Sequence, residues 1–422
     1  MNNKKILIVV GTIVCATIFV IVLSIFLTGS YFGDQDEPPK LIVISFDGFR
    51  ADYVSPTLTP TLWSLKQTGV TGRMFPQFIS KTFPNHFSIA TGLYEESHGI
   101  VANNMYDPEL NLTFDLSHST QVWWDNGYSL PLWIANQKMG NRKSGAIMWP
   151  GCGFTFGGDR AFYSVEFNRS IDMKGRVDIL MNWFTDKTNP ANLVFLYIEN
   201  PDETAHKHGP FGNETLAQVR MADEAVAYLL ENLDNHNLTS STNIILVSDH
   251  GMEEFKSTTT VNLTELVPDQ TSFQQFGGSQ AISILPNPGV EDQVYQMFNT
   301  LGKTNHFRVY KRDEIPEEYH YRDNIRIQPI LLEAEPGYEI AFSSWKHPDS
   351  MWGNHGNNNT QPEMEALFIA SGPQFKDSFN LNGTSFFNID LYPIMVDILN
   401  LNVGNYKCNG TDLITRNLLA EL

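Results

Sequence analysis

Three aspartates follow short apolar runs of this chain. Asp47 comes directly after the run LIVISF, Asp249 follows IILV after one serine, and Asp202 lies four residues beyond the end of LVFLYI. Unbroken apolar runs are typical of buried parallel strands, whose carboxyl ends meet at one edge of a sheet. A single aspartate after a strand is usually a helix cap or a solvated loop acid. Three together predict a cluster of carboxylates at that edge.

Three histidines accompany these aspartates. His206 lies four residues after Asp202, so both side chains share one face if a helix begins there. His250 directly follows Asp249, and His355 stands in a loop between glycines. Oxygen and nitrogen ligands without thiolate suit a catalytic zinc site with one open position. Six candidate ligands are too many for one tetrahedral ion. They predict two zinc ions about 3.5 to 4 Å apart, which could clamp the attacking and leaving oxygens of a displacement.

Thr82 is the candidate nucleophile. It lies in the segment KTFPNHF, where Pro84 and the apolar residues that follow predict the first turns of a helix. The N-terminus of a helix stabilises an alkoxide and a phosphate. Because a threonine hydroxyl is a weak nucleophile near neutral pH, it needs activation, which metal coordination can supply. Taken alone, Thr82 would be read as a helix cap.

Strand and helix patterns alternate along the chain after residue 40. We predict strands at Leu41–Phe46, Leu193–Ile198, Ile244–Val247 and Ala366–Ala370, and helices at Thr59–Thr68, Leu216–Leu233 and Leu391–Leu399. This alternation favours an α/β layered domain with a central, mainly parallel sheet flanked by helices. The sequence contains no internal repeat and no low-complexity linker after residue 40. It therefore predicts a single catalytic domain over residues 40–422.

The N-terminal segment has the pattern of a membrane anchor. Residues 6–28 are apolar apart from Gly, Ser and Thr, and about 20 apolar residues suffice to cross a bilayer. Lys4 and Lys5 precede this run and Asp34 follows it, so the positive-inside rule places residues 1–5 in the cytoplasm. Residues 29–39 would form a stalk. We expect a single-pass type II membrane protein with an extracellular catalytic domain; the alternative is secretion after cleavage of the segment.

Composition narrows the range of partners. The formal net charge is −19, which argues against binding polymeric nucleic acid through a basic surface. No obligate protein partner is expected. The N-x-S/T sequons of the chain are consistent with a glycoprotein. Cys152 and Cys408 could form one disulfide or remain as two thiols. The sequons are at Asn111, Asn168, Asn213, Asn237, Asn262, Asn358, Asn382 and Asn409.

Several longer motifs resemble the ectonucleotide pyrophosphatase/phosphodiesterase family. They are FDGFR, KTFPNH, GLYEESHGIVANNMYDP, WPG, PDETAHKHGP and SDHGM, and they occur in the family's order between residue 40 and about residue 410. The chain is similar to the short members of types four and five, which consist of the catalytic domain alone. The resemblance implies the fold of the alkaline phosphatase superfamily.

The resemblance also implies roles for individual residues. Asp202, His206 and His355 would hold one zinc ion, and Asp47, Asp249 and His250 the other. Thr82 would bridge to the second ion and form a phospho-threonine intermediate. Asn103 would contact a phosphate oxygen, and Phe83 and Tyr163 would stack on a base. One departure is Asn358, which stands where the family usually has an aspartate.

Three functions remain open on this reading. The first is hydrolysis of nucleotide phosphodiester or pyrophosphate bonds, in dinucleoside polyphosphates, NAD-like dinucleotides or nucleoside triphosphates, to a nucleoside 5′-monophosphate. The second is a choline phosphodiesterase acting on lysolipids or glycerophosphocholine. The third is a non-catalytic adhesion or receptor ectodomain, against which the complete ligand set argues. A sulfatase is disfavoured because the nucleophile position holds Thr82 and not cysteine.

Overall fold

The apolar runs form the centre of an eight-stranded sheet in the computed structural model. Strand β1 (Lys40–Phe46) lies between β7 (Leu193–Ile198) and β8 (Thr242–Val247) and is parallel to both. Every residue of β7 and β8 is buried. Burial on both faces explains why these strands show no alternation of polar and apolar residues.

The whole sheet is mainly parallel, as the sequence predicted. Its order is β18-β2-β17-β8-β1-β7-β5-β6, and β17 alone runs antiparallel to its two neighbours among the described strands. The predicted strand near the C-terminus is therefore present, but it runs in the opposite direction to the strands beside it. The remaining strands are β18 (Phe379–Phe387), β2 (Val70–Phe75), β17 (Phe368–Ser371), β5 (Ser144–Ile147) and β6 (Tyr163–Val165).

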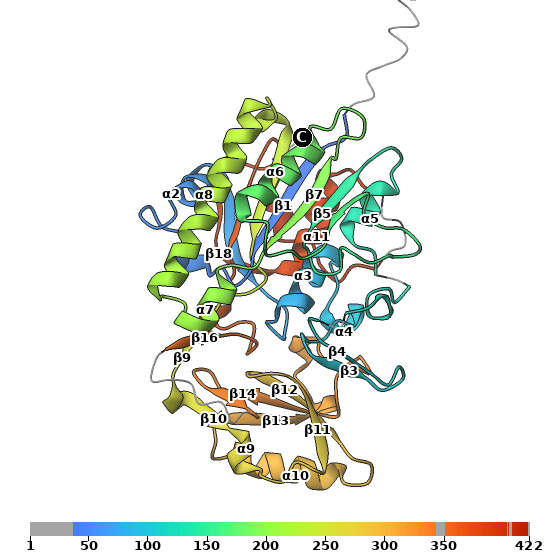
Figure 1. The fold of residues 1–422 in the computed structure, drawn as a ribbon, viewed down its shortest axis with the longest axis vertical. Coiled ribbons are helices and arrows are strands. Elements are labelled where there is room, and N and C mark those ends of the chain that lie inside the picture. Colours follow the sequence, from blue (N-terminus) through green and yellow to red (C-terminus); the bar gives the residue numbers. More distant parts are fainter. Residues whose placement is uncertain are drawn as a thin grey trace, which may run out of the picture. The chain divides into compact units, whose positions relative to one another are not determined.

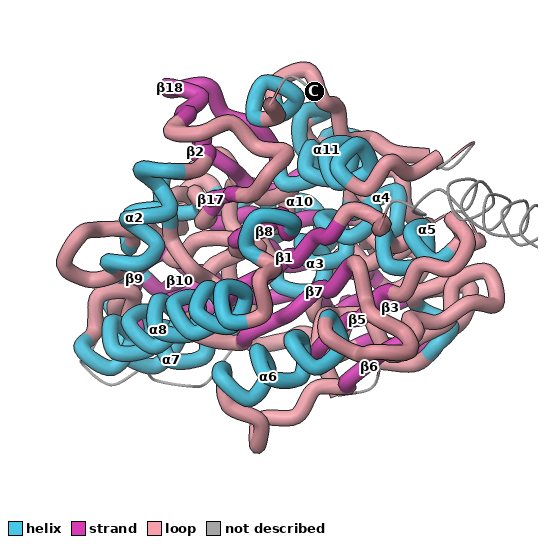
Figure 2. The backbone as a smooth tube through the Cα atoms, turned by 90° about the horizontal axis from the view of Figure 1, so that it is seen from above, coloured by secondary structure: helices cyan, strands magenta, loops and turns pink. Residues whose placement is uncertain are grey.

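Helices cover both faces of this sheet (Figure 2). One face carries α2 (Pro60–Thr68), α6 (Met173–Phe184) and α8 (Asn213–Asn235), and the other carries α3 (Thr82–Thr91), α5 (Leu132–Gln137) and α11 (Leu391–Ile398). Helix α8 buries Val219, Ala222, Val226, Leu229 and Leu233. Their spacing of three or four residues places them on one stripe, which explains why this segment packs as a helix.

A second, smaller sheet was not predicted. Its order is β11-β12-β14-β13, all antiparallel, and it shares an apolar core with α9 and α10 that includes Ile284 and Phe298. Figure 1 shows it on the side of the large sheet where α7 (Asp202–His208) lies. Its elements are α9 (Leu263–Leu266), β11 (Phe273–Gly278), β12 (Ala281–Pro286), α10 (Glu291–Gly302), β13 (Phe307–Lys311) and β14 (Ile330–Ala334).

Short elements complete the fold. Helix α4 spans Glu95–His98, and 3-10 turns such as Ala51–Tyr53 and Asn388–Asp390 connect longer elements. Cys152 and Cys408 are both free thiols. Three two-stranded ribbons pair β3 (Met105–Asp107) with β4 (Leu112–Phe114), β9 (Glu253–Phe255) with β16 (Trp352–Asn354), and β10 (Thr260–Asn262) with β15 (Glu339–Ala341).

The structure describes residues 37–117, 119–127, 129–342, 351–402, 404 and 407–420. Residues Pro39–Leu422 group into one compact unit by their internal contacts. The predicted tail, membrane segment and most of the stalk lie outside the described residues. Within those residues, no helix is both long and apolar enough to cross a membrane.

Candidate active site

The turn after β1 brings two of the predicted ligand loops together. Gly48 has a φ of +64°, a conformation that glycine adopts at little cost. A Cβ atom on Gly48 would lie 2.9 Å from the Cβ of Asp202, so no side chain fits there. The Asp202 N–H donates to the carbonyl of Asp47 at 3.0 Å, and the Gly48 N–H donates to Oδ1 of Asp249 at 3.2 Å. These contacts fix the three aspartates relative to one another.

The first group of candidate ligands consists of Asp202, His206 and His355, whose ligand atoms lie within 4.8 Å of one another. The two carboxylate oxygens of Asp202 divide between the histidines. Oδ2 lies 3.3 Å from Nε2 of His206, and Oδ1 lies 3.4 Å from Nε2 of His355. Asp202 and His206 come from the first and fifth residues of α7, which is the predicted arrangement on one helix face.

The second group consists of Asp47, Asp249 and His250, again with ligand atoms within 4.8 Å of one another. Nε2 of His250 lies 3.4 Å from Oδ1 of Asp47 and 3.0 Å from Oδ2 of Asp249. The rings of His250 and His355 stack with centroids 3.5 Å apart, so the two groups adjoin. All six predicted ligands therefore meet in one place.

The three histidines share one orientation. Nδ1 of His206 donates to the carbonyl of Gly353 at 2.9 Å, and Nδ1 of His250 donates to that of Gly251 at 2.8 Å. Nδ1 of His355 donates to the carbonyl of Ser80 at 2.7 Å. Because a carbonyl oxygen only accepts, each Nδ1 carries the proton and each Nε2 presents a lone pair to its cluster. Backbone carbonyls fix metal-binding histidines in this way.

The buried carboxylates need a counter-charge. Burial, together with the neighbouring charges of Asp249 and Asp202, raises the pKa of Asp47 well above its usual value. Burial would also raise the pKa of Asp249, but the imidazoles of His250 and His86 hold it well below its usual value. Oδ1 of Asp47 and Oδ2 of Asp249 are buried and make no hydrogen bond with the described residues. Buried charges are normally paired or bind a metal.

The donor set is that of a divalent cation. Nε2 of His250 and Oδ1 of Asp202 are also buried without a hydrogen-bond partner among the described residues. The first cluster thus contains one unsatisfied oxygen and the second contains two unsatisfied oxygens and one nitrogen, and no ligand of either cluster is a sulfur atom. Oxygen and nitrogen ligands of this kind suit zinc, and the negative charge of the carboxylates offsets the positive charge of the cation.

Thr82 lies beside these clusters as the first residue of α3 and is buried. The loop before it is tied to the loop of His355. The Ser80 hydroxyl donates to the carbonyl of Asn357 at 2.9 Å, and Nζ of Lys81 donates to the carbonyl of His355. Burial lowers the pKa of Lys81 to about 8. The hydrogen bonds of Ser80 and Lys81 therefore couple the position of Thr82 to the loop of His355, a candidate ligand of the first cluster.

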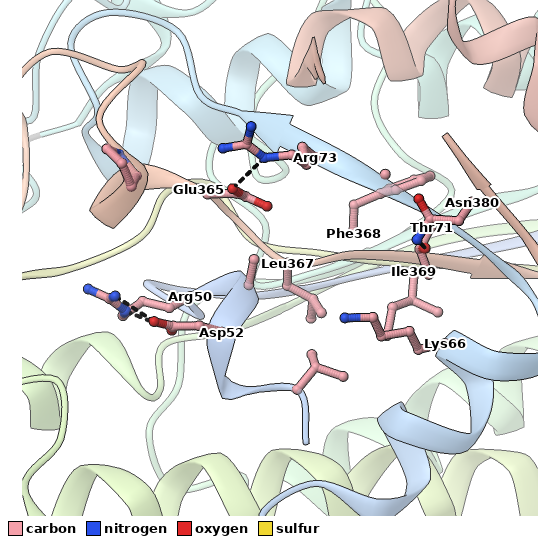
Figure 3. A pocket seen from close by; sticks show the side chains of 14 residues that line it. Arg50, Asp52, Lys66, Thr71, Arg73, Glu365, Leu367, Phe368, Ile369 and Asn380 are labelled. Carbon is pink, nitrogen blue, oxygen red and sulfur yellow. Dashed lines mark hydrogen bonds and ion pairs between the residues drawn. The ribbon is translucent and has the colours of Figure 1, made fainter. Parts of the chain in front are cut away.

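A pocket of about 550 Å³ opens onto this arrangement. Its lining includes Asp47, Thr82, Asp202, His206 and His355. Another pocket, of about 420 Å³, is lined by charged residues but by none of the six ligands (Figure 3). There Arg50 pairs with Asp52 and Arg73 pairs with Glu365. The first of the two is therefore the candidate active site.

Asn103 and Phe83, which the sequence proposed for substrate binding, both line the 550 Å³ pocket. The Phe83 N–H donates to Oδ1 of Asn103 at 2.9 Å. Because that oxygen is occupied, the Nδ2 group is the part of the amide that remains to donate to a ligand. The Phe83 ring packs edge-on against Phe114, with centroids 5.9 Å apart.

Tyr163 is not brought to this pocket. It lies on β6, where its ring stacks on Trp183 with centroids 5.0 Å apart and its hydroxyl donates to the carbonyl of Asn189 at 3.0 Å. Phe167, four residues further on, lines the pocket instead and is 49% exposed. Sequence reasoning missed Phe167 because its loop has no periodicity. The sequence signal for Phe167 was an aromatic residue in a polar stretch, and this signal is weak.

The sequence analysis did not single out Tyr197, and it noted Asn358 only as a departure from the family pattern. The hydroxyl of Tyr197 donates to Oδ2 of Asp47 at 2.6 Å and so orients this carboxylate. Asn358 belongs to neither cluster, because its Nδ2 donates to the Tyr319 hydroxyl and its Oδ1 accepts from the Thr360 N–H. This asparagine orders its own loop.

Comparison with known proteins agrees with this geometry. The family described as type I phosphodiesterase / nucleotide pyrophosphatase matches residues 41–358. The bis(5′-adenosyl)-triphosphatase enpp4 of Xenopus laevis is 36% identical over 386 residues, covering 91% of this chain and 82% of that protein. Ectonucleotide pyrophosphatase/phosphodiesterase family member 5 of Homo sapiens is 35% identical over 374 residues, covering 88% of this chain and 76% of that protein.

Solved structures show the same fold. Murine ectonucleotide pyrophosphatase/phosphodiesterase 5 has a TM-score of 0.84 and 36% identity, covering 90% of this chain and 100% of that one. An inactive threonine-to-alanine variant of the murine protein, in complex with AMP, matches with the same values. The residues that the family model matches, 41–358, include Thr82 and all six candidate ligands. This chain therefore belongs to the type I phosphodiesterase/nucleotide pyrophosphatase family of hydrolases.

Proposed function

We propose that this chain is a two-zinc nucleotide phosphodiesterase. It would cleave phosphodiester or pyrophosphate bonds of dinucleoside polyphosphates, NAD-like dinucleotides or nucleoside triphosphates, and would release a nucleoside 5′-monophosphate. One observation carries this proposal: a single pocket contains a threonine at a helix N-terminus, residues of two adjoining ligand clusters, and the aromatic side chains of Phe83 and Phe167. The names of the relatives, among them a bis(5′-adenosyl)-triphosphatase, support the substrate class.

Asp202, His206 and His355 would hold one zinc ion, and Asp47, Asp249 and His250 the other. When bound, the ions would neutralise phosphate oxygens and stabilise the alkoxide form of Thr82. Thr82 would also be a ligand of the second ion. The Nδ1 hydrogen bonds of the histidines to carbonyls keep the ligand nitrogens aimed at these positions.

Thr82 would carry the covalent chemistry. Its Oγ would form a bond to phosphorus while the bond from phosphorus to the leaving oxygen breaks, which gives a phospho-threonine ester. Water would then hydrolyse this ester and release the 5′-monophosphate. Thr82 is the first residue of α3, where the helix dipole favours a phosphate, and Nδ2 of Asn103 would donate to a phosphate oxygen.

Charge favours a diester over a monoester. Two zinc ions bring +4 and the three aspartates return −3, which leaves roughly one positive charge for the substrate. A diester carries one negative charge and matches it. A monoester dianion needs a further cation, whereas Asn103 offers only a neutral hydrogen bond.

Two aromatic side chains in the pocket suit a nucleobase, and the relatives decide between a nucleotide and a choline ester. Phe83 and Phe167 both line the pocket, and flat rings suit a nucleobase. A choline group would also accept aromatic rings, through cation–π attraction. The name of one relative and the bound AMP of another favour the nucleotide.

We further propose that the catalytic domain works outside the cell, anchored by residues 6–28 as a single-pass type II membrane glycoprotein. The apolar run and the lysines before it support this orientation. Protease added to intact cells should digest the domain from the surface. Full protection in intact cells, with digestion only after lysis, would contradict this location.

Tyr197→Phe should weaken zinc binding by about tenfold to a hundredfold, because groups that orient a ligand typically contribute that much. Zinc affinity is measured by competition with a chelator of known strength. Tyr228→Phe is the control, since the Tyr228 hydroxyl on α8 donates to Asp178 on α6 in an exposed hydrogen bond. Equal zinc affinity in wild type and both variants would show that Tyr197 does not orient Asp47.

Thr82→Ala should reduce turnover roughly a thousandfold or more, because it removes the nucleophile and at most one metal contact. Zinc content, measured by elemental analysis, should stay at two ions per chain. Thr82→Ser should retain part of the activity because it keeps a hydroxyl. Wild-type turnover in Thr82→Ala would rule out the covalent route.

The wild-type enzyme should prefer a nucleotide p-nitrophenyl ester over p-nitrophenyl phosphate by about tenfold to a hundredfold in kcat/KM. One unmatched charge is worth about 1.5 to 3 kcal/mol of lost interaction. Both substrates release the same chromophore, and bis-p-nitrophenyl phosphate, a diester without a base, separates the effect of phosphate charge from that of base stacking. Similar efficiencies on the two esters would contradict the charge argument.

Phe167→Ala should raise KM for nucleotide diesters by several-fold to about a hundredfold, since stacking on one base is worth about 1 to 3 kcal/mol. Bis-p-nitrophenyl phosphate, which has no base, should be turned over as before. Phe162→Ala is a matched control, because Phe162 is 47% exposed but does not line the pocket. Faster cleavage of glycerophosphocholine than of diadenosine triphosphate by wild type would favour the choline function.

A further inference from the structure

Helix α7 carries two pairs of side chains spaced four residues apart. Asp202 and His206 belong to the first ligand cluster. Glu203 and Lys207, each one position further along, also line the pocket and pair with each other at 3.3 Å. The same helix that holds the cluster therefore presents charged groups to the space beside it.

A second cation reaches Glu203 from another part of the chain. Nη2 of Arg169, in the loop after β6, lies 3.4 Å from Oε2 of Glu203, while Lys207 approaches Oε1. Arg169 also lines the pocket, and its guanidinium carbon lies 5.3 Å from the centre of the Phe167 ring. We call Arg169, Glu203 and Lys207 the charged rim.

We propose that Arg169 and Lys207 bind the phosphates of the leaving group, so that the enzyme prefers nucleotide substrates whose leaving group carries further phosphates. This inference rests on the proposed function and specifies its substrate class. Dinucleoside polyphosphates have such a leaving group, whereas a nucleotide nitrophenyl ester does not.

The distribution of charge within the pocket supports this role. Two cations and one carboxylate leave the rim with roughly one positive charge. The remaining acid of the pocket, Glu199, is already engaged by Arg176 through two hydrogen bonds of 2.5 and 3.0 Å. The scissile phosphate would balance the charge of the metal clusters. The rim is the cationic group left in the pocket for a second phosphate.

The rim pairs are weak enough to open. The side chains of Arg169 and Lys207 are 66% and 65% exposed, and that of Glu203 is 37% exposed. Exposed ion pairs contribute at most about 1 kcal/mol. Each cation can therefore turn from Glu203 to a phosphate, with which Arg forms bidentate hydrogen bonds. Local cations also matter because the chain has a net charge of −19, which repels polyanions.

The chemistry gives the rim a role in the transition state as well as in binding. As Oγ of Thr82 bonds to phosphorus and its proton passes to solvent, the bond to the bridging oxygen breaks. The electron pair leaves on that oxygen, so the departing phosphate gains one negative charge. Cations positioned at the leaving group stabilise this developing charge.

The test compares two substrates in the double variant Arg169→Gln/Lys207→Gln. We expect kcat/KM for diadenosine triphosphate to fall at least tenfold, while kcat/KM for a thymidine 5′-monophosphate p-nitrophenyl ester stays within about twofold. Arg416→Gln is the control, because its side chain is 70% exposed and paired with Asp412 but lies outside the pocket. It should change neither value. Turnover of the nitrophenyl ester also reports that the double variant is folded.

A second variant changes the charge in the opposite direction. Glu203→Gln removes the competing carboxylate, so the ratio of kcat/KM for diadenosine triphosphate to that for the nitrophenyl ester should rise. Equal losses on both substrates in the double variant, or no loss on either, would overturn the inference. If wild type cleaves the nitrophenyl ester and the double variant keeps wild-type efficiency on diadenosine triphosphate, the inference alone fails. If wild type cleaves neither diadenosine triphosphate nor the nitrophenyl ester, both the proposed function and this inference fail.

Discussion

Three carboxylates held together away from water are the constraint on which this structure depends. Asp47 and Asp249 are buried, and Asp202 lies against them. Like charges at such distances repel strongly in a medium of low dielectric constant, and the raised pKa of Asp47 reflects that repulsion and its burial. Bound divalent cations turn this cost into affinity. The fold therefore holds an arrangement of negative charges that bound divalent cations would stabilise.

The scaffold meets this constraint at the end of the parallel strands. Strands β1, β7 and β8 are neighbours in the sheet, so the loops that follow them meet at one edge. Gly48 lets two of these loops approach closely, and backbone carbonyls fix the three imidazoles. The Gly48 turn and the histidine hydrogen bonds are local features, but together they position six ligand atoms without a disulfide between Cys152 and Cys408.

The sequence allowed prediction of the features that depend on local pattern. Continuous apolar runs indicated the buried strands, and the polar residues that follow them indicated the clusters. The small antiparallel sheet was not predicted, because β11 and β13 mix apolar and polar residues and the apolar run of β14 is only Ile330–Leu332. The direction of β17 depends on its pairing with distant strands. Tyr163 and Phe167 lie only four residues apart, and only the packing of Tyr163 on Trp183 distinguishes their roles.

The central claim is that the two clusters hold two zinc ions. Diffraction from crystals of the zinc-loaded protein, recorded above and below the zinc absorption edge, tests it directly. We expect two anomalous peaks about 3.5 to 4 Å apart. One should lie about 2.0 to 2.2 Å from ligand atoms of Asp202, His206 and His355, and the other at that distance from Asp47, Asp249 and His250. A single peak, or zinc bound to other residues, would contradict the account.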